Sequence, residues 1–289
     1  MRAGNVVMKA HSDSFMPEFS VSGSGAIPLQ NNHQDNTFGA GNRKSTIVKM
    51  GGNDTASTFT PRVSKSLIEE MTDAELAEFK KLPSIELDDI QQVQCISTIS
   101  EGWAYPLNRF MNEQELIESM NMNTITDADG ERHIQSVPIT QYVTKDQMEA
   151  LKDEKKIALT WKGDVLAVIE DPEFFDNRVE EISTKTFGTR SANHPFIARM
   201  EQQGEYLVSG AKMRFTQRIK YNDDLDQYRL LPSEIKKIAD ERGADAVYAF
   251  QVRNPLHNGH CLLLKDTREQ LIKQGFKNPI LLLHPLGGW

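Results

Sequence analysis

Hydrophobic and polar positions follow three different patterns along the 289-residue chain, and each pattern predicts a different kind of structure. Over residues 1–60, apolar side chains are scattered among Ser, Gly and Asn without any period. Such a segment cannot bury enough apolar surface to offset the entropy that ordering would cost. We therefore expect residues 1–60 to be a disordered tail.

Residues 61–230 change between helix and strand patterns over short lengths. Thr72–Lys81 predicts a helix near the start, because Thr72 and Glu75 have the spacing of a capping box, and Asn112–Met120 predicts another. Strand-like stretches separated by Gly-containing turns follow at residues 133–140, 157–161 and 165–169. These patterns indicate a mostly β domain that begins with a helix.

Residues 231–289 show the longer rhythm of an α/β unit. Continuous apolar runs at Ala246–Phe250 and Pro279–Leu283 are typical of strands covered on both faces. Between them, Cys261–Gln274 predicts a helix, and Pro232–Arg242 predicts another before the first strand. Gly residues are expected to end the two helices, at Gly243 and Gly275. Strand, helix and strand at this spacing predict a parallel sheet.

The helix predicted over Cys261–Gln274 carries several leucines. We expect them on its buried side: Leu262, Leu263, Leu264 and Leu271.

Charge narrows the classes of partner. The chain has 33 Lys and Arg against 41 Asp and Glu, a net charge of −8, whereas a general nucleic-acid binder needs a basic surface. The sequence also lacks the run of roughly 18 apolar residues that a transmembrane helix needs. We expect neither nucleic acid nor a membrane as a partner.

Cysteine usage and the N-terminus bear on the compartment. Cys95 and Cys261 are too few for a disulfide framework, which favours a reducing environment. No apolar core of about 7 residues follows Met1, so the sequence does not predict a signal peptide. We expect a cytoplasmic protein, and a transit peptide in the Ser-rich, acid-poor start is the less favoured alternative.

The chemistry-bearing residues gather in one loop, between the first strand of the C-terminal unit and the helix that follows. Ligands of open parallel sheets bind outside the carboxyl ends of the strands, and a helix N-terminus favours phosphate. Arg253 provides a planar guanidinium for an oxyanion, Gln251 adds an amide donor, and Gly259 lets the backbone approach a phosphate. His257 and His260 are three residues apart and can share one side of the first turn. This loop predicts a phosphate or anion site.

Two other interpretations of the loop are weaker. Asn254-Pro255 can serve only to start the helix. Zinc binding by His257 and His260, with His284 as a third ligand, lacks the usual i,i+4 spacing and intervening Glu of helical zinc motifs. We therefore predict no protein-bound metal.

The ten residues Gln251-Val-Arg-Asn-Pro-Leu-His-Asn-Gly-His260 resemble the QxRNPxHxGH signature of ATP sulfurylase (sulfate adenylyltransferase). The shorter HxGH pattern is shared by many nucleotidyltransferases, whereas the ten-residue form is highly specific. Other segments also resemble this family, so that the resemblance covers about residues 83–289. They lie at residues 101–111, 221–229, 244–250 and 284–289. The last of them is most similar to the sulfurylase part of bifunctional 3′-phosphoadenosine-5′-phosphosulfate (PAPS) synthases.

The resemblance implies a mixed α/β and β fold with three parts. After the disordered tail (1–60) expected from composition, the resemblance implies a PUA-like β domain (61–230) with an N-terminal helix, followed by an incomplete Rossmann-like nucleotidyltransferase domain (231–289). It also implies a reaction in sulfate activation, in which ATP and sulfate give adenylyl sulfate and pyrophosphate. Mg²⁺ would arrive with ATP, and the complete protein would be a homodimer.

The resemblance also implies roles for residues of the loop. Gln251 and Arg253 should hold sulfate, and the Val252 backbone and Asn254 should hold the α-phosphate region. His257 and His260 should contact the phosphates and stabilise charge on the leaving group.

The match departs from the family pattern in two places within the chain: Arg109 replaces a usual small residue, and Val252 replaces a usual Thr or Leu. The family's later nucleotide motif, a GRD-type loop, does not occur, and neither does a true phosphate loop of an adenylyl-sulfate kinase. We therefore expect a truncated chain that shows no turnover alone. The alternative to an enzyme is a non-catalytic fragment or interaction module.

Overall fold

The computed structural model describes residues 64–286, so the tail predicted over residues 1–60 lies outside the described part. The described chain forms two compact units. We call them the β-rich unit (residues 64–226 and 230–238) and the C-terminal unit (residues 227–229 and 239–286). The domain boundaries expected from the sequence remain a prediction, and each unit is described separately.

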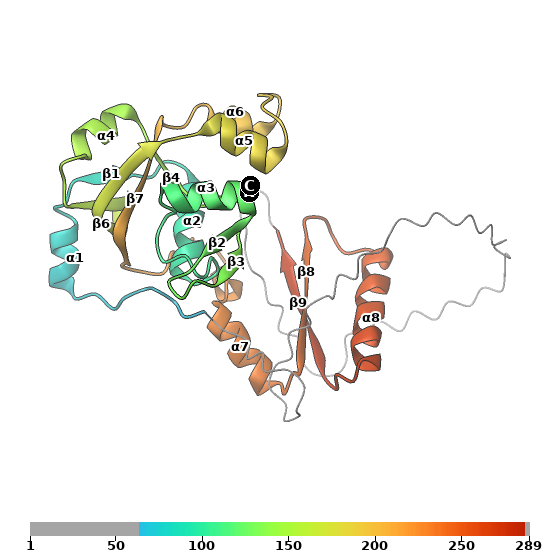
Figure 1. Cartoon of the computed structure of the whole chain (residues 1–289). Helices are drawn as coiled ribbons and strands as arrows, with labels where there is room; N and C mark the ends of the chain where they lie inside the picture. The colour runs from blue at the N-terminus through green and yellow to red at the C-terminus, as the bar shows by residue number, and fades with distance from the viewer. Residues whose placement is uncertain (1–63, 287–289) are drawn as a thin grey trace. The chain divides into compact units, whose positions relative to one another are not determined.

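The β-rich unit holds short helices around its strands (Figure 1). Its helices are α1 (Asp73–Phe79), α2 (Ile90–Ser100), α3 (Glu113–Met122), α4 (Lys145–Leu151), α5 (Val179–Phe187) and α6 (Pro195–Met200). Its strands are β1 (Ser84–Glu86), β2 (Thr124–Thr126), β3 (Arg132–Ile134), β4 (Gln141–Val143), β5 (Lys156–Trp161), β6 (Asp164–Asp176) and β7 (Tyr206–Phe215). A 3₁₀ turn, η1 (Asp226–Tyr228), and helix α7 (Pro232–Glu241) follow.

Five of these strands form one sheet, in the order β1-β5-β6-β7-β4. The long strands β5, β6 and β7 pair antiparallel, and the short edge strand β1 pairs parallel with β5. β2 and β3 form a separate two-stranded hairpin. The mixture of strands and short helices that the sequence predicted for this part of the chain is confirmed, although its helices hold more residues than its strands.

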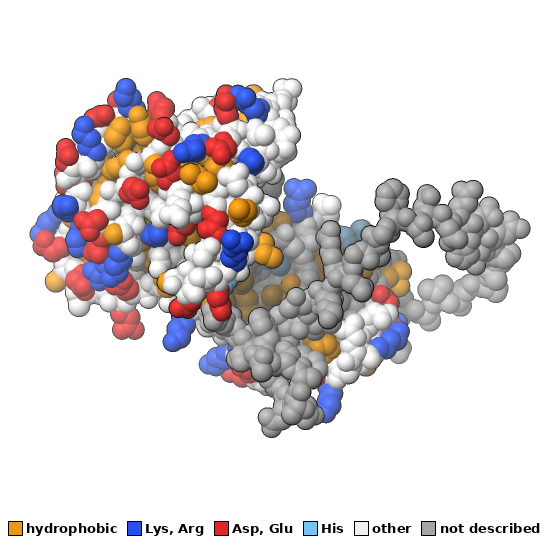
Figure 2. Space-filling model, viewed as in Figure 1, with side chains coloured by type: hydrophobic (Ala, Val, Ile, Leu, Met, Phe, Trp, Pro, Cys, Tyr) orange, Lys and Arg blue, Asp and Glu red, His pale blue; other side chains and the backbone are white. Residues whose placement is uncertain are grey.

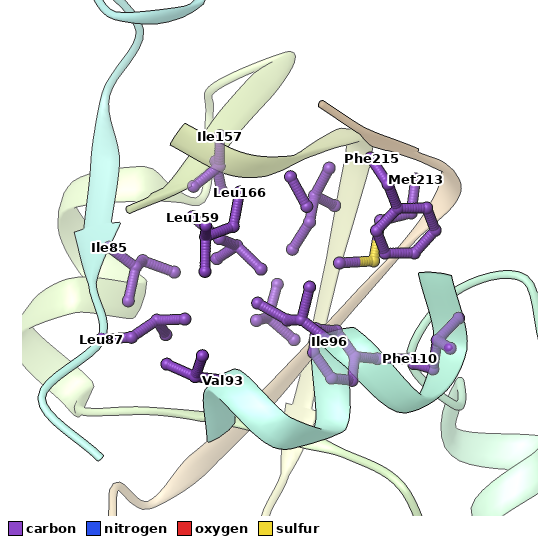
Figure 3. Packing of buried hydrophobic residues seen from close by; sticks show 14 of the residues in the cluster. Ile85, Leu87, Val93, Ile96, Phe110, Ile157, Leu159, Leu166, Met213 and Phe215 are labelled. Carbon is purple, nitrogen blue, oxygen red and sulfur yellow. The ribbon is translucent and has the colours of Figure 1, made fainter. Parts of the chain in front are cut away.

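The main core of the β-rich unit lies between this sheet and α2 (Figure 3). Ile157 and Leu159 of β5 point toward Val93 and Ile96 of α2, and Phe215 of β7 closes one side. These five side chains are at most 1% exposed. Apolar burial at about 25 cal/mol per Å² makes such a cluster the main source of stability for this unit.

Helix starts follow the capping residues that the sequence offers. The Thr72 hydroxyl accepts the Glu75 backbone N–H, and the Glu75 carboxylate accepts the Thr72 N–H, which confirms the predicted capping box. α3 begins in the same way, with Asn112 and Glu115. The unusual Arg109 has a local partner there, because its guanidinium lies 2.6 Å from the Glu115 carboxylate.

One predicted strand is mostly wrong. Residues 133–140 were expected to be β-like, but strand β3 covers only Arg132–Ile134. Pro138 lacks a backbone N–H and cannot take part fully in a ladder, and residues 135–140 run as irregular chain. The turn before β3 is held by Asp127, which accepts the backbone N–H groups of Asp129 and Glu131.

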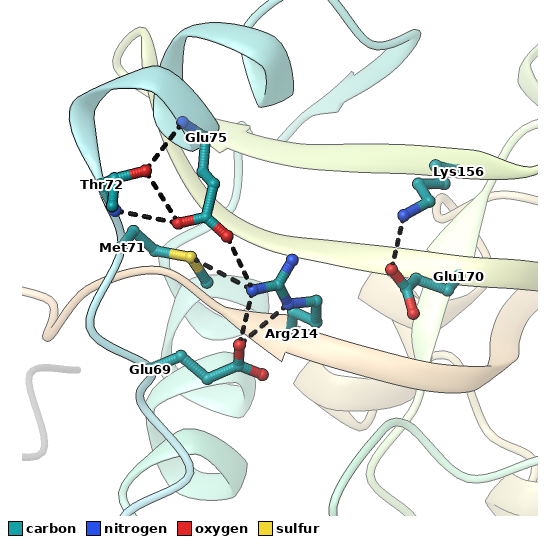
Figure 4. A network of polar contacts seen from close by, with 7 residues as sticks. All are labelled: Glu69, Met71, Thr72, Glu75, Lys156, Glu170 and Arg214. Atoms are coloured by element: carbon teal, nitrogen blue, oxygen red, sulfur yellow. Dashed lines mark hydrogen bonds and ion pairs between the residues drawn. The ribbon is translucent and has the colours of Figure 1, made fainter.

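Charges of both signs are interspersed on the face of the β-rich unit seen in Figure 2. Arg214 of β7 shows the local arrangement, since it contacts Glu69, Glu75 and the sulfur of Met71 (Figure 4). Nearby, Lys156 pairs with Glu170 across β5 and β6 at 2.7 Å. Arg214 and Lys156 are therefore both paired with carboxylates.

The C-terminal unit is a strand–helix–strand arrangement. β8 (Ala246–Val252) and β9 (Pro279–Pro285) pair parallel, and α8 (Asn258–Lys273) lies beside them (Figure 1). The parallel pairing that the sequence predicted is confirmed. Gly243 and Gly275 adopt positive φ angles of 63° and 98° just after α7 and α8, as predicted for helix stops.

Burial in the C-terminal unit differs from the prediction. Leu264 and Leu271 are partly buried, but Leu262 and Leu263 are 68% and 52% exposed. Successive helical residues are about 100° apart, so three consecutive leucines cannot all face one two-stranded sheet. The expectation that both strands are covered on both faces is also wrong within the described residues, because most positions of β8 and β9 are only partly buried.

No helix of the described residues is both long and apolar enough to cross a membrane.

Candidate anion site at the β8–α8 loop

The loop between β8 and α8 is shaped by its own residues. β8 ends at Val252, and α8 begins at Asn258 with His257 as its N-cap. The His257 ring takes the place of the usual Ser or Asp, because its Nδ1 accepts the Gly259 backbone N–H at 3.1 Å. A Cβ at Gly259 would lie 3.0 Å from this ring. Gly259 therefore leaves space for the capping imidazole, which is a local reason for glycine that sequence reasoning missed.

A hollow of about 290 Å³ opens beside this loop. Its lining residues come from the end of β8, the loop, the first turn of α8 and the position after β9: Gln251, Val252, Arg253, Asn254, His260 and Leu286. The Leu286 N–H donates to the Val252 carbonyl at 2.7 Å, which ties the end of β9 to the end of β8. Five of the seven residues that the sequence predicted for the site thus line a single hollow.

The two remaining predicted residues, His257 and Gly259, lie next to the hollow and do not line it. The His257 and His260 rings stack, with centroids 3.8 Å apart and an angle of 22° between planes. The His260 and Phe250 rings also meet at a steep angle, with centroids 5.4 Å apart and 64° between planes. His257 therefore braces His260, which is the imidazole that reaches the hollow.

The electrostatic character of the hollow favours an anion. Arg253 is exposed and has no ion-pair partner among residues 64–286. The Nδ1 atom of His260 is buried and has no hydrogen-bond partner in the same described part of the chain. The lining residues include no carboxylate. A guanidinium without a carboxylate partner, beside a helix N-terminus, is suited to phosphate or sulfate.

Gln251 has a partner that lies outside the predicted site. Its amide nitrogen is 2.9 Å from Nδ1 of His284, which sits opposite Gln251 in the β8–β9 register. Burial lowers the pKa of His284 below its ordinary value of 6.5. Sequence reasoning considered His284 as a zinc ligand and as part of a family-like segment, whereas its place against Gln251 follows from the register of β8 and β9.

The zinc alternative receives no support from the described residues. The one group among them that brings three candidate ligand atoms within 4.8 Å of one another is Asp127, Glu131 and His133, in the β2–β3 hairpin. There, His133 is 2.7 Å from the Asp127 carboxylate, and the same carboxylate also accepts backbone N–H groups. These bonds already account for the cluster as a brace of the hairpin turn.

A second hollow, of about 300 Å³, lies at α5 and α6 in the β-rich unit. It is lined by Val179, Glu180, Ser183, Arg190, Ile197 and Glu201. Its one cation, Arg190, is already paired with Glu180. This lining is less suited to an anion than the hollow at the β8–α8 loop.

Comparisons with known proteins agree with this arrangement. A PUA-like domain model matches residues 59–217, and an ATP-sulfurylase model matches residues 226–289. Among solved structures, the hexameric APS kinase from Thiobacillus denitrificans resembles the chain with a TM-score of 0.56 and 23% identity, over 78% of this chain and 39% of that chain. At this identity, the likeness shows the fold alone.

Curated relatives are more similar in sequence. ATP sulfurylase 2 of Arabidopsis thaliana is 36% identical over 248 residues, which is 85% of this chain and 50% of that protein. ATP sulfurylase 4, chloroplastic, of the same plant is 39% identical over 199 residues, covering 68% and 42%. A sulfate adenylyltransferase of Halothermothrix orenii is 28% identical over 194 residues, covering 65% and 48%. The chain spans about half the length of the curated relatives that it matches.

Fold and loop together define a PUA-like domain followed by an α/β unit with a parallel pair of strands. The PUA-like match covers more than half of the chain, and the match to the ATP-sulfurylase model begins nine residues after it ends (226 − 217 = 9). The chain belongs to the PUA-like family and is a relative of the ATP sulfurylases.

Proposed function

We propose that this chain serves the reaction of ATP sulfurylases, in which ATP and sulfate give adenylyl sulfate and pyrophosphate. The observation that carries the proposal is the hollow at the β8–α8 loop, where Gln251, Arg253 and His260 meet without a carboxylate. The relatives' names point to the same reaction. The adenylyl sulfate formed in this way would be the activated form of sulfate, so the chain would act in sulfate activation.

The chemistry needs positioning and charge stabilisation more than a reactive side chain. A sulfate oxygen forms a bond to the α-phosphorus of ATP, and the bond from that phosphorus to the pyrophosphate oxygen breaks in line. The electron pair leaves with pyrophosphate, so negative charge grows on the leaving group. The protein then contributes by aligning two anions that repel each other and by facing donors toward the growing charge.

Each loop residue has a proposed role. Gln251 and Arg253 hold sulfate, because an amide N–H and a planar guanidinium suit a tetrahedral oxyanion. Asn254 and the Val252 backbone hold the α-phosphate region. His260 donates to the phosphates. His257 stacks on His260, and the two imidazoles together stabilise the negative charge that develops on the leaving pyrophosphate.

Mg²⁺ enters the proposal as a companion of ATP. The lining of the hollow has no carboxylate, and Mg²⁺ prefers oxygen ligands such as carboxylates and phosphates. The substrate's own phosphates would therefore supply its ligands. The metal would screen the phosphate charge, and the chain's residues would hold and orient the complex.

The proposal also covers assembly and location. A complete protein would be a homodimer, as the family resemblance implies. Cys95 and Cys261 are both free thiols, which is consistent with a reducing compartment, and we place the protein in the cytoplasm.

Arg253 provides the test of the proposed function. The purified 289-residue chain should bind MgATP and sulfate in calorimetry, and Arg253→Ala should weaken sulfate binding about 10-fold to 100-fold, because a charge-assisted hydrogen bond contributes about 1.5–3 kcal/mol. Arg253→Lys is the matched control, since it keeps the charge but loses the planar fork. Equal sulfate affinity of wild type and Arg253→Ala would refute the proposal.

A turnover assay separates the enzyme from the non-catalytic alternative. Formation of adenylyl sulfate by the wild-type chain, lost in Arg253→Ala, favours the enzyme. Binding of both substrates without turnover favours a binding module that needs further sequence to react. This alternative is supported by one observation: the chain spans only 50% and 42% of the two plant relatives.

A further inference from the structure

His284 contacts the proposed sulfate-holding amide from the neighbouring strand. It lies opposite Gln251 in the parallel pairing of β8 and β9, and the two side chains meet at 2.9 Å although 33 residues separate them. Leu286, two residues further on, lines the hollow. The contact therefore lies at the rim of the site.

The contact requires one tautomer of His284. The amide nitrogen of Gln251 faces Nδ1 of His284 and can only donate, so the hydrogen bond forms with the tautomer whose Nδ1 accepts. An imidazole that accepts at Nδ1 is neutral and carries its proton on Nε2. The partial burial of His284 favours the same neutral form, because burial disfavours charge.

The direction of the hydrogen bond between Gln251 and His284 determines which end of the Gln251 amide an anion in the hollow would meet. A primary amide has two N–H groups, and His284 uses one of them. The nitrogen end of the Gln251 amide is then held in place, and its second N–H is free for an acceptor in the hollow that Gln251 lines. If the amide were rotated by half a turn, its oxygen would take the nitrogen's place and repel an oxyanion.

We propose that His284 is a positioning residue, which sets the orientation of the Gln251 amide so that an N–H, and not the carbonyl oxygen, faces sulfate. This inference rests on the proposed function, because it assumes that the hollow takes sulfate. It adds a residue from β9 to a site otherwise built from the end of β8, the loop, the first turn of α8 and Leu286. Its effect is on ground-state binding of sulfate, so it should leave MgATP affinity unchanged.

A structural role for His284 predicts something different. The Nε2 atom of His284 is buried and has no partner among the described residues 64–286, so the ring is not fixed by a second hydrogen bond. If the ring only filled space, any side chain of similar size would serve. If it orients the amide, the variant must present an acceptor at the position of Nδ1.

Two amide variants separate these roles. In His284→Asn, the Oδ1 atom takes the place of Nδ1 and can accept from Gln251. In His284→Gln, the longer side chain moves its amide toward the position of Nε2 and leaves Gln251 without that acceptor. We expect His284→Asn to bind sulfate within about twofold of wild type, and His284→Gln and His284→Ala to bind about fivefold more weakly, because a neutral hydrogen bond has a modest net effect.

The experiment uses the full 289-residue chain, with sulfate and MgATP as separate probes in calorimetry. Side-chain amide resonances of Gln251 in ¹H–¹⁵N spectra give a second readout, assigned by their loss in Gln251→Glu. In wild type and His284→Asn, one N–H of this pair should shift on sulfate addition. In His284→Gln, the shift should be much smaller.

Outcomes for the two proposals are distinct. If wild type binds neither sulfate nor MgATP, the proposed function fails and this inference fails with it. If wild type binds both and all three variants bind sulfate equally well, only the positioning role is overturned. Should His284→Ala not fold, the comparison of His284→Asn with His284→Gln decides. Equal weakening in both amide variants would indicate a need for the ring itself and would also overturn the inference.

Discussion

His257 offers a quantitative test of how the site is built. Its ring caps α8 through the Gly259 N–H and stacks on His260 at 3.8 Å. An N-cap contributes about 1 kcal/mol, and a ring contact that is partly exposed contributes about 0.5 kcal/mol. His257→Ala should therefore lower the stability of the start of α8 by about 1.5 kcal/mol, which corresponds to about a tenfold change in an equilibrium constant.

Amide hydrogen exchange measures this effect locally. In His257→Ala, the amides of Gly259 and Cys261 should exchange about tenfold faster than in wild type, because Gly259 loses its acceptor and Cys261 donates to the His257 carbonyl in the first turn. Amides in the β-rich unit should be unaffected and provide an internal control.

His257→Asn is the matched variant. Asn is a favoured N-cap and restores an acceptor for Gly259, but it has no ring to stack on His260. Exchange should then be only about twofold faster than in wild type. The reasoning is refuted if the Asn and Ala variants exchange equally fast, or if His257→Ala leaves α8 unchanged. Either result would mean that the imidazole does not cap the helix.

Three further predictions concern other parts of the chain. Gly204→Ala should lower the free energy of unfolding by at least about 2 kcal/mol in urea denaturation, because its Cβ would lie 1.9 Å from the Val143 carbonyl oxygen; an unchanged midpoint would contradict this. Burial raises the pKa of Cys95 to about 11, so a thiol reagent at about pH 8 should label the exposed Cys261 first and the partly buried Cys95 much more slowly; equal rates would contradict this. Burial lowers the pKa of His284 below 6.5, so the unfolded chain takes up this proton first as the pH falls. The contribution of neutral His284 to the free energy of unfolding is therefore complete above about pH 6.5, and it is lost as the pH falls from 6.5 through the lower pKa of the folded state. Thermal unfolding should show this slope in wild type and a flatter one in His284→Asn, and identical slopes would count against it.

Local signals in the sequence predicted local structure well. Thr72 and Glu75 form the expected capping box because both partners lie within one turn of helix. Gly243 and Gly275 stop their helices because a left-handed backbone conformation costs glycine little. The parallel pairing of β8 and β9 followed from the length of the connection, which is long enough for a crossover helix.

Predictions that depended on distant neighbours were less successful. Leu262 and Leu263 look like core residues by type, but their burial depends on how many strands lie under α8, and the described sheet has two. The stretch after β3 looks strand-like, but a strand needs a partner with matching N–H and C=O groups, and residues 135–140 lack a continuous one. Hydrophobic type alone does not specify the partner.

The site itself divides along the same line. The order of residues from Gln251 to His260 was sufficient to identify a loop of donors at a strand end, since those residues are neighbours in the chain and the helix start orients them. The pairing of β8 with β9 places His284 against Gln251 and Leu286 at the hollow. The first turn of α8 stacks His257 on His260. Contacts across a sheet depend on register, and register is a property of two segments packed together, which neither segment specifies alone.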